Sequence, residues 1–264
     1  MTYKEKQFNT MKVESDGGIA VVRFDRPEAM NAANEEMSHE RLEIFSALAA
    51  DDSVRVVIVT GSEKAYCAGG DLAAFSKFEV ADAQVWAQRG LAYQKVLSEM
   101  PKPTIAAIAG YAYGGGLENV LMCDLRVAAD NAKFALPEIN VGIFPGGGGT
   151  QRLTHNLPVA LVKEMIFLGR TLEAEEALRF GLVNKVVPLE SLMEEAMGWA
   201  KKLLRKPPLA LNAAKTAINA AYSADLATGL NLEAQAWAAL YGTRDQKEGM
   251  GAFLEKRKPA FTGK

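Results

Sequence analysis

Two glutamates in glycine-rich surroundings are the residues of this chain best suited to acid–base chemistry. Glu118 closes the segment Gly110–Glu118, in which three consecutive glycines follow a predicted strand and open a predicted helix. Amides at a helix N-terminus have no intrahelical acceptor and point along the positive end of the helix dipole. The segment is therefore suited to hold an oxyanion, although the same glycines also suit a tight turn between a strand and a helix.

The second glutamate, Glu138, lies 20 residues after Glu118 and is the only charged residue between Lys133 and Arg152. A carboxyl group in apolar surroundings has a raised pKa and can exchange protons near neutral pH. Taken alone, Glu138 is better explained as a helix-capping residue that follows Pro137.

A further loop of small residues adds possible hydrogen-bond donors. The segment Lys64–Leu72 follows a predicted buried strand that ends at Thr60, and its residues Ala68–Gly70 are small enough to expose backbone N–H groups. Such groups occur in many loops, so this segment gains meaning only beside the two glutamates.

The sequence lacks the residue patterns that other kinds of catalysis need. His39 and His155 are the only histidines, and neither is spaced from another histidine or a cysteine as zinc ligands are. The sequence contains no Gly-x-Ser-x-Gly, no P-loop and no dinucleotide-binding fingerprint. Cys67 and Cys123 form no Cys-x-x-Cys pair, and we expect both to be reduced thiols of an intracellular protein. Acid–base work therefore falls to carboxylates, and we expect no metal site.

The composition indicates a globular chain with balanced charges. Its 264 residues are 49% hydrophobic and 23% charged, and 30 basic residues stand against 32 acidic ones. The net charge of −2 argues against nucleic-acid binding, which favours a basic excess. No apolar run approaches the ~20 residues that span a bilayer, and Met1–Phe8 lacks the apolar core of a signal peptide. We expect a cytoplasmic protein that does not bind membranes.

These residues need a framework of strands and helices to bring them together. Apolar, β-branched runs predict strands, and apolar residues at helical spacing predict the helices between them. The expected strands are 19–24, 54–60, 104–109, 125–129 and 182–187, and the expected helices are 34–50, 81–100, 171–180, 189–204, 209–221 and 228–241. We predict an α/β core of residues 1–195, followed by a helical segment of residues 196–264 that covers the core or a neighbouring subunit.

Taken together, these motifs resemble the enoyl-CoA hydratase/isomerase (crotonase) superfamily. The resemblance covers nearly the whole chain, in the order DRPEAMNA, CAGGDL, GGGLE, PE, PGGGGTQRL and EGMGAFLEKR. It implies the α/β crotonase fold, a spiral core of ββα units with a C-terminal helical trimerisation segment. It also implies a homotrimer or a dimer of trimers.

The resemblance further implies an acyl-CoA thioester as the substrate and no separate cofactor. The backbone N–H groups of Gly70 and Gly115 would form an oxyanion hole for the thioester carbonyl. Glu138 would exchange the proton at the α-carbon, and Glu118 would orient the attacking water and help to deprotonate it. The other implied substrate- and CoA-binding positions are Ala29, Lys64, Ala65, Ala68, Asp71, Leu72, Gly114, Phe144 and Lys256.

Three positions depart from the usual pattern of the superfamily. Asn119 stands where relatives usually carry an apolar residue, so it would alter the tuning of Glu118 or contact a polar acyl group. Glu28 and Ala73 stand where many relatives place lysines near the CoA phosphates. The cations that could replace those lysines are Arg26, Lys64, Lys256 and Lys258.

The retention of both glutamates favours a hydratase that adds water across the 2,3 double bond of an enoyl-CoA. Isomerases of the superfamily often keep only the counterpart of Glu138, so an isomerase is the alternative, together with a ring-processing hydrolase or lyase. A distant alternative is RNA binding, which some relatives perform through a lysine-rich helix. The corresponding stretch Asn34–Glu43 is acidic here and would repel a phosphate backbone.

Overall fold

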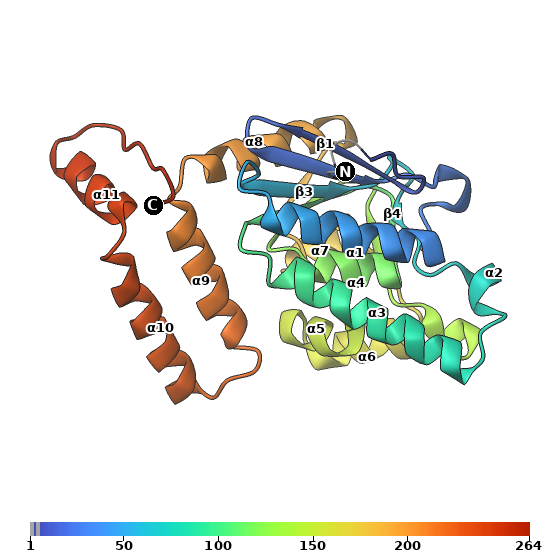
Figure 1. The fold of residues 1–264 in the computed structure, drawn as a ribbon. Helices are drawn as coiled ribbons and strands as arrows, with labels where there is room; N and C mark the ends of the chain where they lie inside the picture. The colour runs from blue at the N-terminus through green and yellow to red at the C-terminus, as the bar shows by residue number, and fades with distance from the viewer. Residues whose placement is uncertain (1–2, 4–5) are drawn as a thin grey trace.

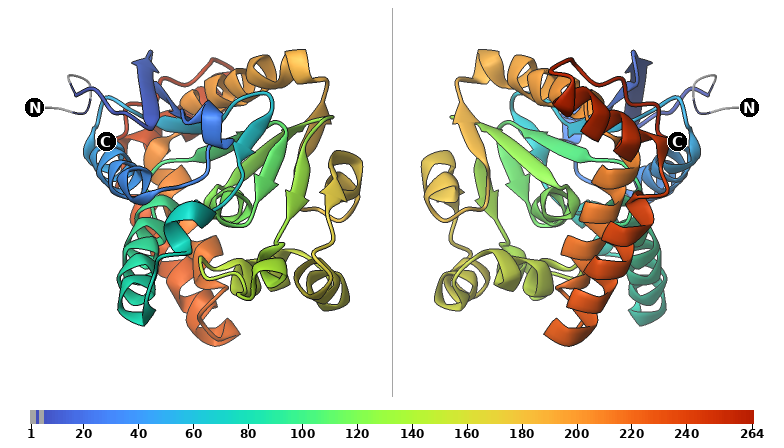
Figure 2. Two further views of the ribbon diagram at one scale, coloured as in Figure 1. Left: turned by 90° about the vertical axis from the view of Figure 1, so that its right-hand side faces the viewer. Right: turned by 90° about the vertical axis from the view of Figure 1, so that its left-hand side faces the viewer.

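Two β-sheets with helices around them form the body of the molecule (Figures 1 and 2). The computed structural model describes residue 3 and residues 6–264. The larger sheet has the strand order β1 (Met11–Asp16), β2 (Ile19–Phe24), β3 (Val56–Thr60), β5 (Thr104–Ile108), β7 (Leu125–Ala129) and β10 (Lys185–Val187). Strands β1 and β2 pair antiparallel, and every later pair in this sheet is parallel. The predicted α/β class is confirmed.

The smaller sheet has the strand order β4 (Ala65–Cys67), β6 (Tyr111–Tyr113), β8 (Lys133–Ala135) and β9 (Leu172–Glu173). Its first three strands are parallel and β9 runs antiparallel to β8. The sequence analysis did not predict this sheet, and it did not predict β1. Each strand of the small sheet has at most three residues, too few for an alternating pattern to be recognised.

Helices fill the space between and around the sheets. They are α1 (Glu35–Ala50), α2 (Leu72–Phe75), α3 (Val80–Ser98), α4 (Gly115–Met122), α5 (Gly149–Asn156), α6 (Val159–Phe167), α7 (Ala174–Arg179), α8 (Leu192–Leu204), α9 (Pro208–Ala220), α10 (Leu226–Leu240) and α11 (Arg244–Leu254). Three short 3₁₀ turns, η1 (Pro27–Ala29), η2 (Glu138–Val141) and η3 (Leu189–Ser191), complete the list. Most expected strands and helices are confirmed within a few residues, whereas α2, α5, α6 and α11 were not predicted.

The large sheet separates two apolar layers, because successive side chains of a strand point to opposite faces. In β3, Val57 and Val59 pack with the buried residues of α1, α3 and α4, while Val56 and Ile58 pack with those of α8. Every residue of β3 is buried, as its continuous apolar sequence indicates. Of the helices described in residues 6–264, none is both long and apolar enough to cross a bilayer.

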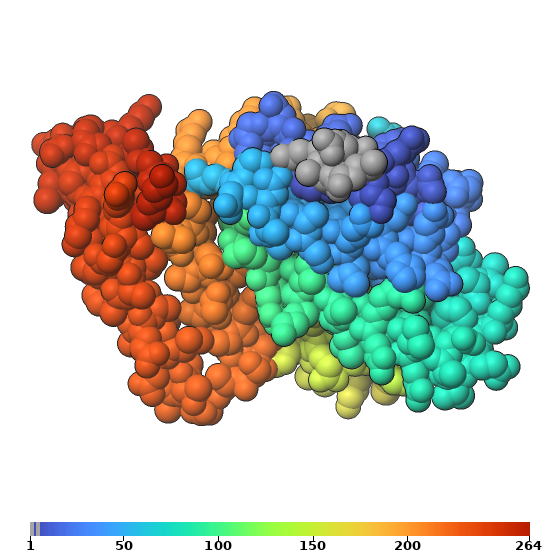
Figure 3. Space-filling model, in the orientation of Figure 1, coloured from blue at the N-terminus to red at the C-terminus, as the bar shows by residue number. Residues whose placement is uncertain are grey.

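Helices α9, α10 and α11 form an arm that extends away from the two sheets (Figures 1 and 3). Helix α8 crosses the predicted division after residue 195 and packs on β3, β5 and β7. The helices that stand apart therefore begin at α9. The division of the chain into two domains remains a prediction.

Candidate active site

The small sheet brings together, at one edge, the three loops that contain the predicted site residues. Strands β4, β6 and β8 are parallel neighbours, so their carboxyl ends lie at the same edge of the sheet. Ligands of open α/β sheets bind beyond that edge. The loops that follow these strands contain Gly69–Gly70, Gly114–Gly115 and Glu138. The Gly114 N–H donates to the Ala135 carbonyl over 2.9 Å, which ties the second loop to the third.

The amides of Gly70 and Gly115 lie on adjoining backbone segments. Gly115 is the first residue of α4, so its N–H has no intrahelical acceptor. Gly70 forms a parallel bridge with Ala33 in which the bonds run from Ala33 N–H to Gly69 O and from Asp71 N–H to Ala33 O. The Gly70 amide therefore points away from that bridge.

Gly69 makes the close approach of these two segments possible. Its φ of +105° lies in the region that favours glycine. A Cβ atom on Gly69 would lie 3.1 Å from the Tyr113 carbonyl oxygen and 3.6 Å from the Gly115 nitrogen. The structure thus brings the two predicted oxyanion-hole residues together at the N-terminus of α4.

Glu118 is buried on the first turn of α4 and is held by the next glycine-rich segment. Its Oε1 accepts hydrogen bonds from Gly147 N–H at 2.7 Å and Gly149 N–H at 2.9 Å. A Cβ on Gly147 would overlap the Glu118 carboxylate, so a larger residue there would force this carboxylate to move. Burial raises the pKa of Glu118, and the two backbone donors with the charges of Arg41 and Arg152 oppose that rise.

Glu138 is half-buried on η2 and has no comparable donors. Its Oε2 is shielded from solvent and has no hydrogen-bond partner among the described residues. Its Oε1 lies beside Gly114, since a Cβ on that glycine would be 3.1 Å from it. Burial, with a smaller contribution from the charge of Glu118, raises the pKa of Glu138 to about 7. A carboxyl group with this pKa can give or take a proton near neutral pH.

Asn119, on the turn beside Glu118, is buried in a polar network. Its Oδ1 accepts from the Tyr66 hydroxyl, and its Nδ2 donates to the Tyr93 oxygen. Arg41 lies over the Tyr93 ring, with its Cζ 4.5 Å from the ring centroid. Both ends of the Asn119 amide are thus occupied by tyrosines. We find no free amide group there for a polar acyl chain.

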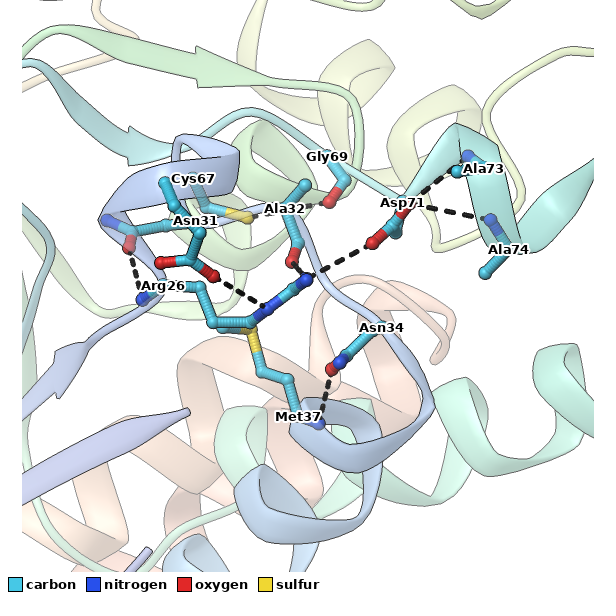
Figure 4. Close-up of polar contacts among 11 residues, drawn as sticks. Arg26, Asn31, Ala32, Asn34, Met37, Cys67, Gly69, Asp71, Ala73 and Ala74 are labelled. Atoms are coloured by element: carbon cyan, nitrogen blue, oxygen red, sulfur yellow. Dashed lines mark hydrogen bonds and ion pairs between the residues drawn. The ribbon is translucent and has the colours of Figure 1, made fainter. Parts of the chain in front are cut away.

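Arg26 and Asp71 form a second polar cluster beside the Gly69–Gly70 loop (Figure 4). The Asp71 carboxylate accepts from the amides of Ala73 and Ala74 at the start of α2, and it lies 3.3 Å from Arg26. Arg26 also donates to the Ala32 carbonyl and lies 3.6 Å from Glu28. Arg26 is therefore already paired within the protein, and the Asp71 side chain serves as a helix cap.

The other predicted substrate-binding residues differ in their location. Ala65 and Gly114 are buried, and Ala29 and Ala68 are half-buried, with η1 linked to the loop through the hydrogen bond from Ala68 N–H to Met30 O. Leu72 and Phe144 are 55% and 66% exposed, and Lys64 is also exposed at the surface. Lys256 follows α11 in the arm, at the opposite end of the molecule from α2 (Figure 1). The structure does not bring Lys256 to this group within one chain.

The sequence analysis did not predict several residues that lie near the site. The donors to Glu118 come from the run Gly146–Gly149, which the sequence analysis included only within the motif PGGGGTQRL. The sequence analysis assigned no role to Arg41, and it quoted Tyr66 only as a member of the segment Lys64–Leu72. In residues 6–264, no group of three or more histidine, cysteine or acidic side chains gathers in the manner of a metal site.

Comparisons with known proteins point to one family. The family model described as enoyl-CoA hydratase/isomerase matches residues 14–264. The crotonyl-CoA hydratase of Syntrophomonas wolfei is 39% identical over 258 residues, which are 97% of this chain and 99% of that protein. A probable enoyl-CoA hydratase of Mycobacterium bovis is 41% identical over 255 residues, covering 97% and 98% of the two chains. The crystal structure of the Bacillus anthracis enoyl-CoA hydratase superposes with a TM-score of 0.93 at 36% identity, covering 97% of this chain and all of that one.

Proposed function

The chain belongs to the enoyl-CoA hydratase/isomerase (crotonase) family, and on that premise we propose that it adds water across the 2,3 double bond of an enoyl-CoA thioester. The observation that carries this proposal is the pair of glutamates in different settings beside one glycine-rich helix N-terminus. Glu118 is anchored by two backbone donors, and Glu138 has a pKa of about 7 and no partner for its Oε2.

In this proposal the thioester carbonyl oxygen lies between the amides of Gly70 and Gly115. Attack of water at C3 moves negative charge onto that oxygen as an enolate forms. Two fixed N–H dipoles stabilise this charge without reorganising, and the loss of one such donor costs ~10²–10³ in rate in other enzymes. The position of Gly115 at the start of α4 adds the positive end of the helix dipole.

The proton transfers are assigned to the two carboxyl groups. Glu118 orients the water and takes its proton as the oxygen bonds to C3. Glu138, in its protonated form, gives a proton to C2 as the enolate collapses. The substrate gains one water, and the proton that Glu118 gained and the one that Glu138 lost are then exchanged with solvent. In the reverse reaction each group has the opposite protonation state.

An isomerase is the alternative, and one observation favours it. Movement of a double bond from C3 to C2 needs only one group that removes and returns a proton, and Glu138 alone has the pKa of about 7 for this role. A 3-enoyl-CoA distinguishes the two functions. An isomerase converts it to the conjugated 2-enoyl-CoA, whereas a hydratase leaves it unchanged.

We further propose that the arm α9–α11 assembles the chain into a homotrimer or a dimer of trimers. Apolar side chains stand exposed along these helices: Leu209, Ile218, Leu226, Leu230, Trp237, Met250, Phe253 and Leu254. Contiguous exposed apolar surface of this kind marks an interaction site. Light scattering should give three or six times the chain mass of 28.5 kDa, and a monomer at micromolar concentration contradicts the proposal.

The hydratase proposal is tested with crotonyl-CoA and the single variants Glu118→Gln and Glu138→Gln. The loss of the conjugated thioester absorbance measures hydration, and mass spectrometry identifies the 3-hydroxyacyl product. The exposed Glu175, on α7, gives the control Glu175→Gln. Full activity in either active-site variant refutes the two-carboxylate scheme, and a wild-type protein that hydrates no 2-enoyl-CoA refutes the function.

A further inference from the structure

Arg41 on helix α1 forms no ion pair with any residue that the structure describes. Its Nε is shielded from solvent and makes no hydrogen bond to any residue that the structure describes. Two other arginines of this region are paired: Arg89 lies 3.6 Å from Glu35, and Arg26 lies 3.3 Å from Asp71. A guanidinium has five N–H donors and stays charged at any working pH. In Arg41 the Nε–H is shielded from water without an acceptor, although the residue as a whole is half-buried.

Two aromatic rings hold Arg41 in place without neutralising it. Its Cζ lies 4.5 Å from the centroid of Tyr93 and 5.9 Å from that of Trp86. Tyr93 is fixed in turn by its hydrogen bond with Asn119. Ring faces attract a cation, but they supply no lone pair for its N–H groups. The network therefore positions the guanidinium and leaves its donors available.

The charge of Arg41 reaches the groups that surround the predicted thioester position. Burial raises the pKa values of the Glu118 carboxyl and the Cys67 thiol, and in both groups the positive charge of Arg41 opposes the rise. Glu118 lies on α4 and Cys67 at the end of β4, so the charge of Arg41 acts on groups of both elements.

A row of aromatic rings leads from the predicted oxyanion hole to Arg41. A Cβ on Gly70 would overlap the Phe75 ring, so this ring lies directly beside the Gly70 backbone. Phe75 packs against Trp86 with 4.9 Å between the ring centroids, and Trp86 is the ring that Arg41 approaches. An acyl chain that starts at Gly70 and follows these rings would end at the guanidinium.

We propose that Arg41 binds a carboxylate at the far end of the acyl chain, so that the preferred substrate is an enoyl-CoA with an acidic terminus. The inference rests on the proposed hydratase function and names its substrate class. A carboxylate accepts two parallel N–H bonds from a guanidinium, the strongest pairing available to this side chain. A methyl-terminated chain would cover the cation without pairing it, which is unfavourable. The site thus discriminates by attraction and by desolvation together.

Two enoyl-CoA esters of equal length test the proposal. One is 2-hexenoyl-CoA, and the other is 5-carboxy-2-pentenoyl-CoA, which carries a carboxylate in place of the terminal methyl group. The proteins are the wild type, Arg41→Met, Arg41→Lys and the control Arg89→Met, which removes a cation that already has a partner. Thermal unfolding of each variant shows whether it is folded.

We expect wild-type kcat/KM to be higher for the acidic ester, and we expect Arg41→Met to lower that value by about 10–100-fold, the range of one lost charged hydrogen-bond pair. Because the charge of Arg41 also lowers the pKa of Glu118, Arg41→Met should slow hydration of the neutral ester too, but by a smaller factor than hydration of the acidic ester. Arg41→Lys should retain part of the preference, and Arg89→Met should leave both values unchanged. A wild type that prefers the neutral ester overturns the proposal. So does an Arg41→Met variant that loses both activities equally, because Arg41 would then serve the shared CoA moiety or the fold.

Binding of the saturated analogues separates this inference from the proposed function. Calorimetry with adipyl-CoA and hexanoyl-CoA needs no reaction, and it should give the same preference and the same loss in Arg41→Met. Tighter binding of adipyl-CoA by a protein that hydrates neither ester would support the acidic-terminus site while refuting the hydratase function. Equal affinity for the two analogues in the wild type overturns the site.

Discussion

Glu118 and Glu138 are the same residue type beside the same glycine-rich backbone, yet their surroundings are opposite. Glu118 is 5% exposed and accepts two backbone hydrogen bonds of 2.7 and 2.9 Å. Glu138 is half-buried, and its shielded Oε2 has no partner within the described part of the chain. Burial raises the pKa of both carboxyl groups. At Glu118 two backbone donors from another loop and the charges of two arginines oppose this rise, whereas at Glu138 only a backbone hydrogen bond within the residue opposes it, and the charge of Glu118 adds to it.

This difference indicates that hydrogen-bond partners, more than depth of burial, distinguish the two proposed roles. Donors fix the charged form of a carboxylate and its orientation, which suits a group that must hold and activate a water molecule. A carboxyl group without donors keeps its proton to higher pH and can deliver it. Changing Glu138 or the surroundings of Glu118 separately tests this assignment.

The largest effect is expected from Glu138→Gln, which removes the proton-exchanging member. Hydration of crotonyl-CoA should slow by ~10²–10⁴, the usual contribution of a general acid–base group. Substrate affinity should change little, because the amide keeps the size of the side chain. Steady-state rates and binding calorimetry measure the two quantities, and the exchange of deuterium at C2 of the saturated acyl-CoA should stop. Continued exchange would show that another group moves this proton.

The second largest effect is expected from Gly147→Ala, which disturbs the anchor of the other member. The new methyl group would overlap the Glu118 carboxylate, which must then rotate away from its two N–H donors. We expect kcat to fall by about 10–100-fold, since misplacement of a catalytic group by an ångström costs this much. Gly146→Ala is the matched control, because a Cβ there meets no atom within 4 Å. Equal activity of the two variants contradicts the anchoring role.

The pH dependence should separate the two directions of the reaction. Hydration needs protonated Glu138, whose pKa is about 7, so the rate should fall up to tenfold per pH unit above that value. Dehydration of the 3-hydroxyacyl-CoA needs the ionised form and should fall below the same pH. Rates of both directions across pH 5–9 measure this. A hydration rate that rises through pH 7 would reverse the assigned roles.

The smallest effect concerns stability. A carboxyl group whose folded pKa is raised to about 7 favours folding fully below its unfolded pKa, and this contribution is lost as pH rises through 7. The Glu138→Gln variant cannot ionise at this position, so its stability does not fall in this way as the pH rises. The variant should therefore be more stable than the wild type by about 1–3 kcal/mol at pH 8, and the difference should vanish near pH 4. Urea unfolding at both pH values measures it, and a less stable variant at pH 8 contradicts the pKa assignment.

How far the sequence predicted the structure depended on the length of each element. The strands Ile19–Phe24 and Leu125–Ala129 were predicted to the residue, because each is a continuous run that is apolar enough to be recognised. The small sheet was missed, since its strands of two or three residues lie inside glycine-rich segments. That sheet is the element that gathers the candidate site.

The site was predicted in its residue types but not in its contacts. Glycine runs and isolated glutamates are visible in one sequence, whereas the donors to Glu118 lie 29 and 31 residues away and follow no local rule. Arg41 shows the same limit, because its proposed role depends on two rings of α3 that lie more than 40 positions further along the chain. Pairings across helices appear only once the chain is folded.

The three parallel strands of the small sheet have a consequence for how such a chain can diversify. Their order along the chain, β4, β6 and β8, is also their order across the sheet, and each is followed by one group of the proposed site: an amide, a second amide and an acid. A substitution after β8 can therefore exchange the acid while both amides stay in register. New reactions on an anionic thioester intermediate would then arise through changes at a single strand terminus, on an unaltered scaffold.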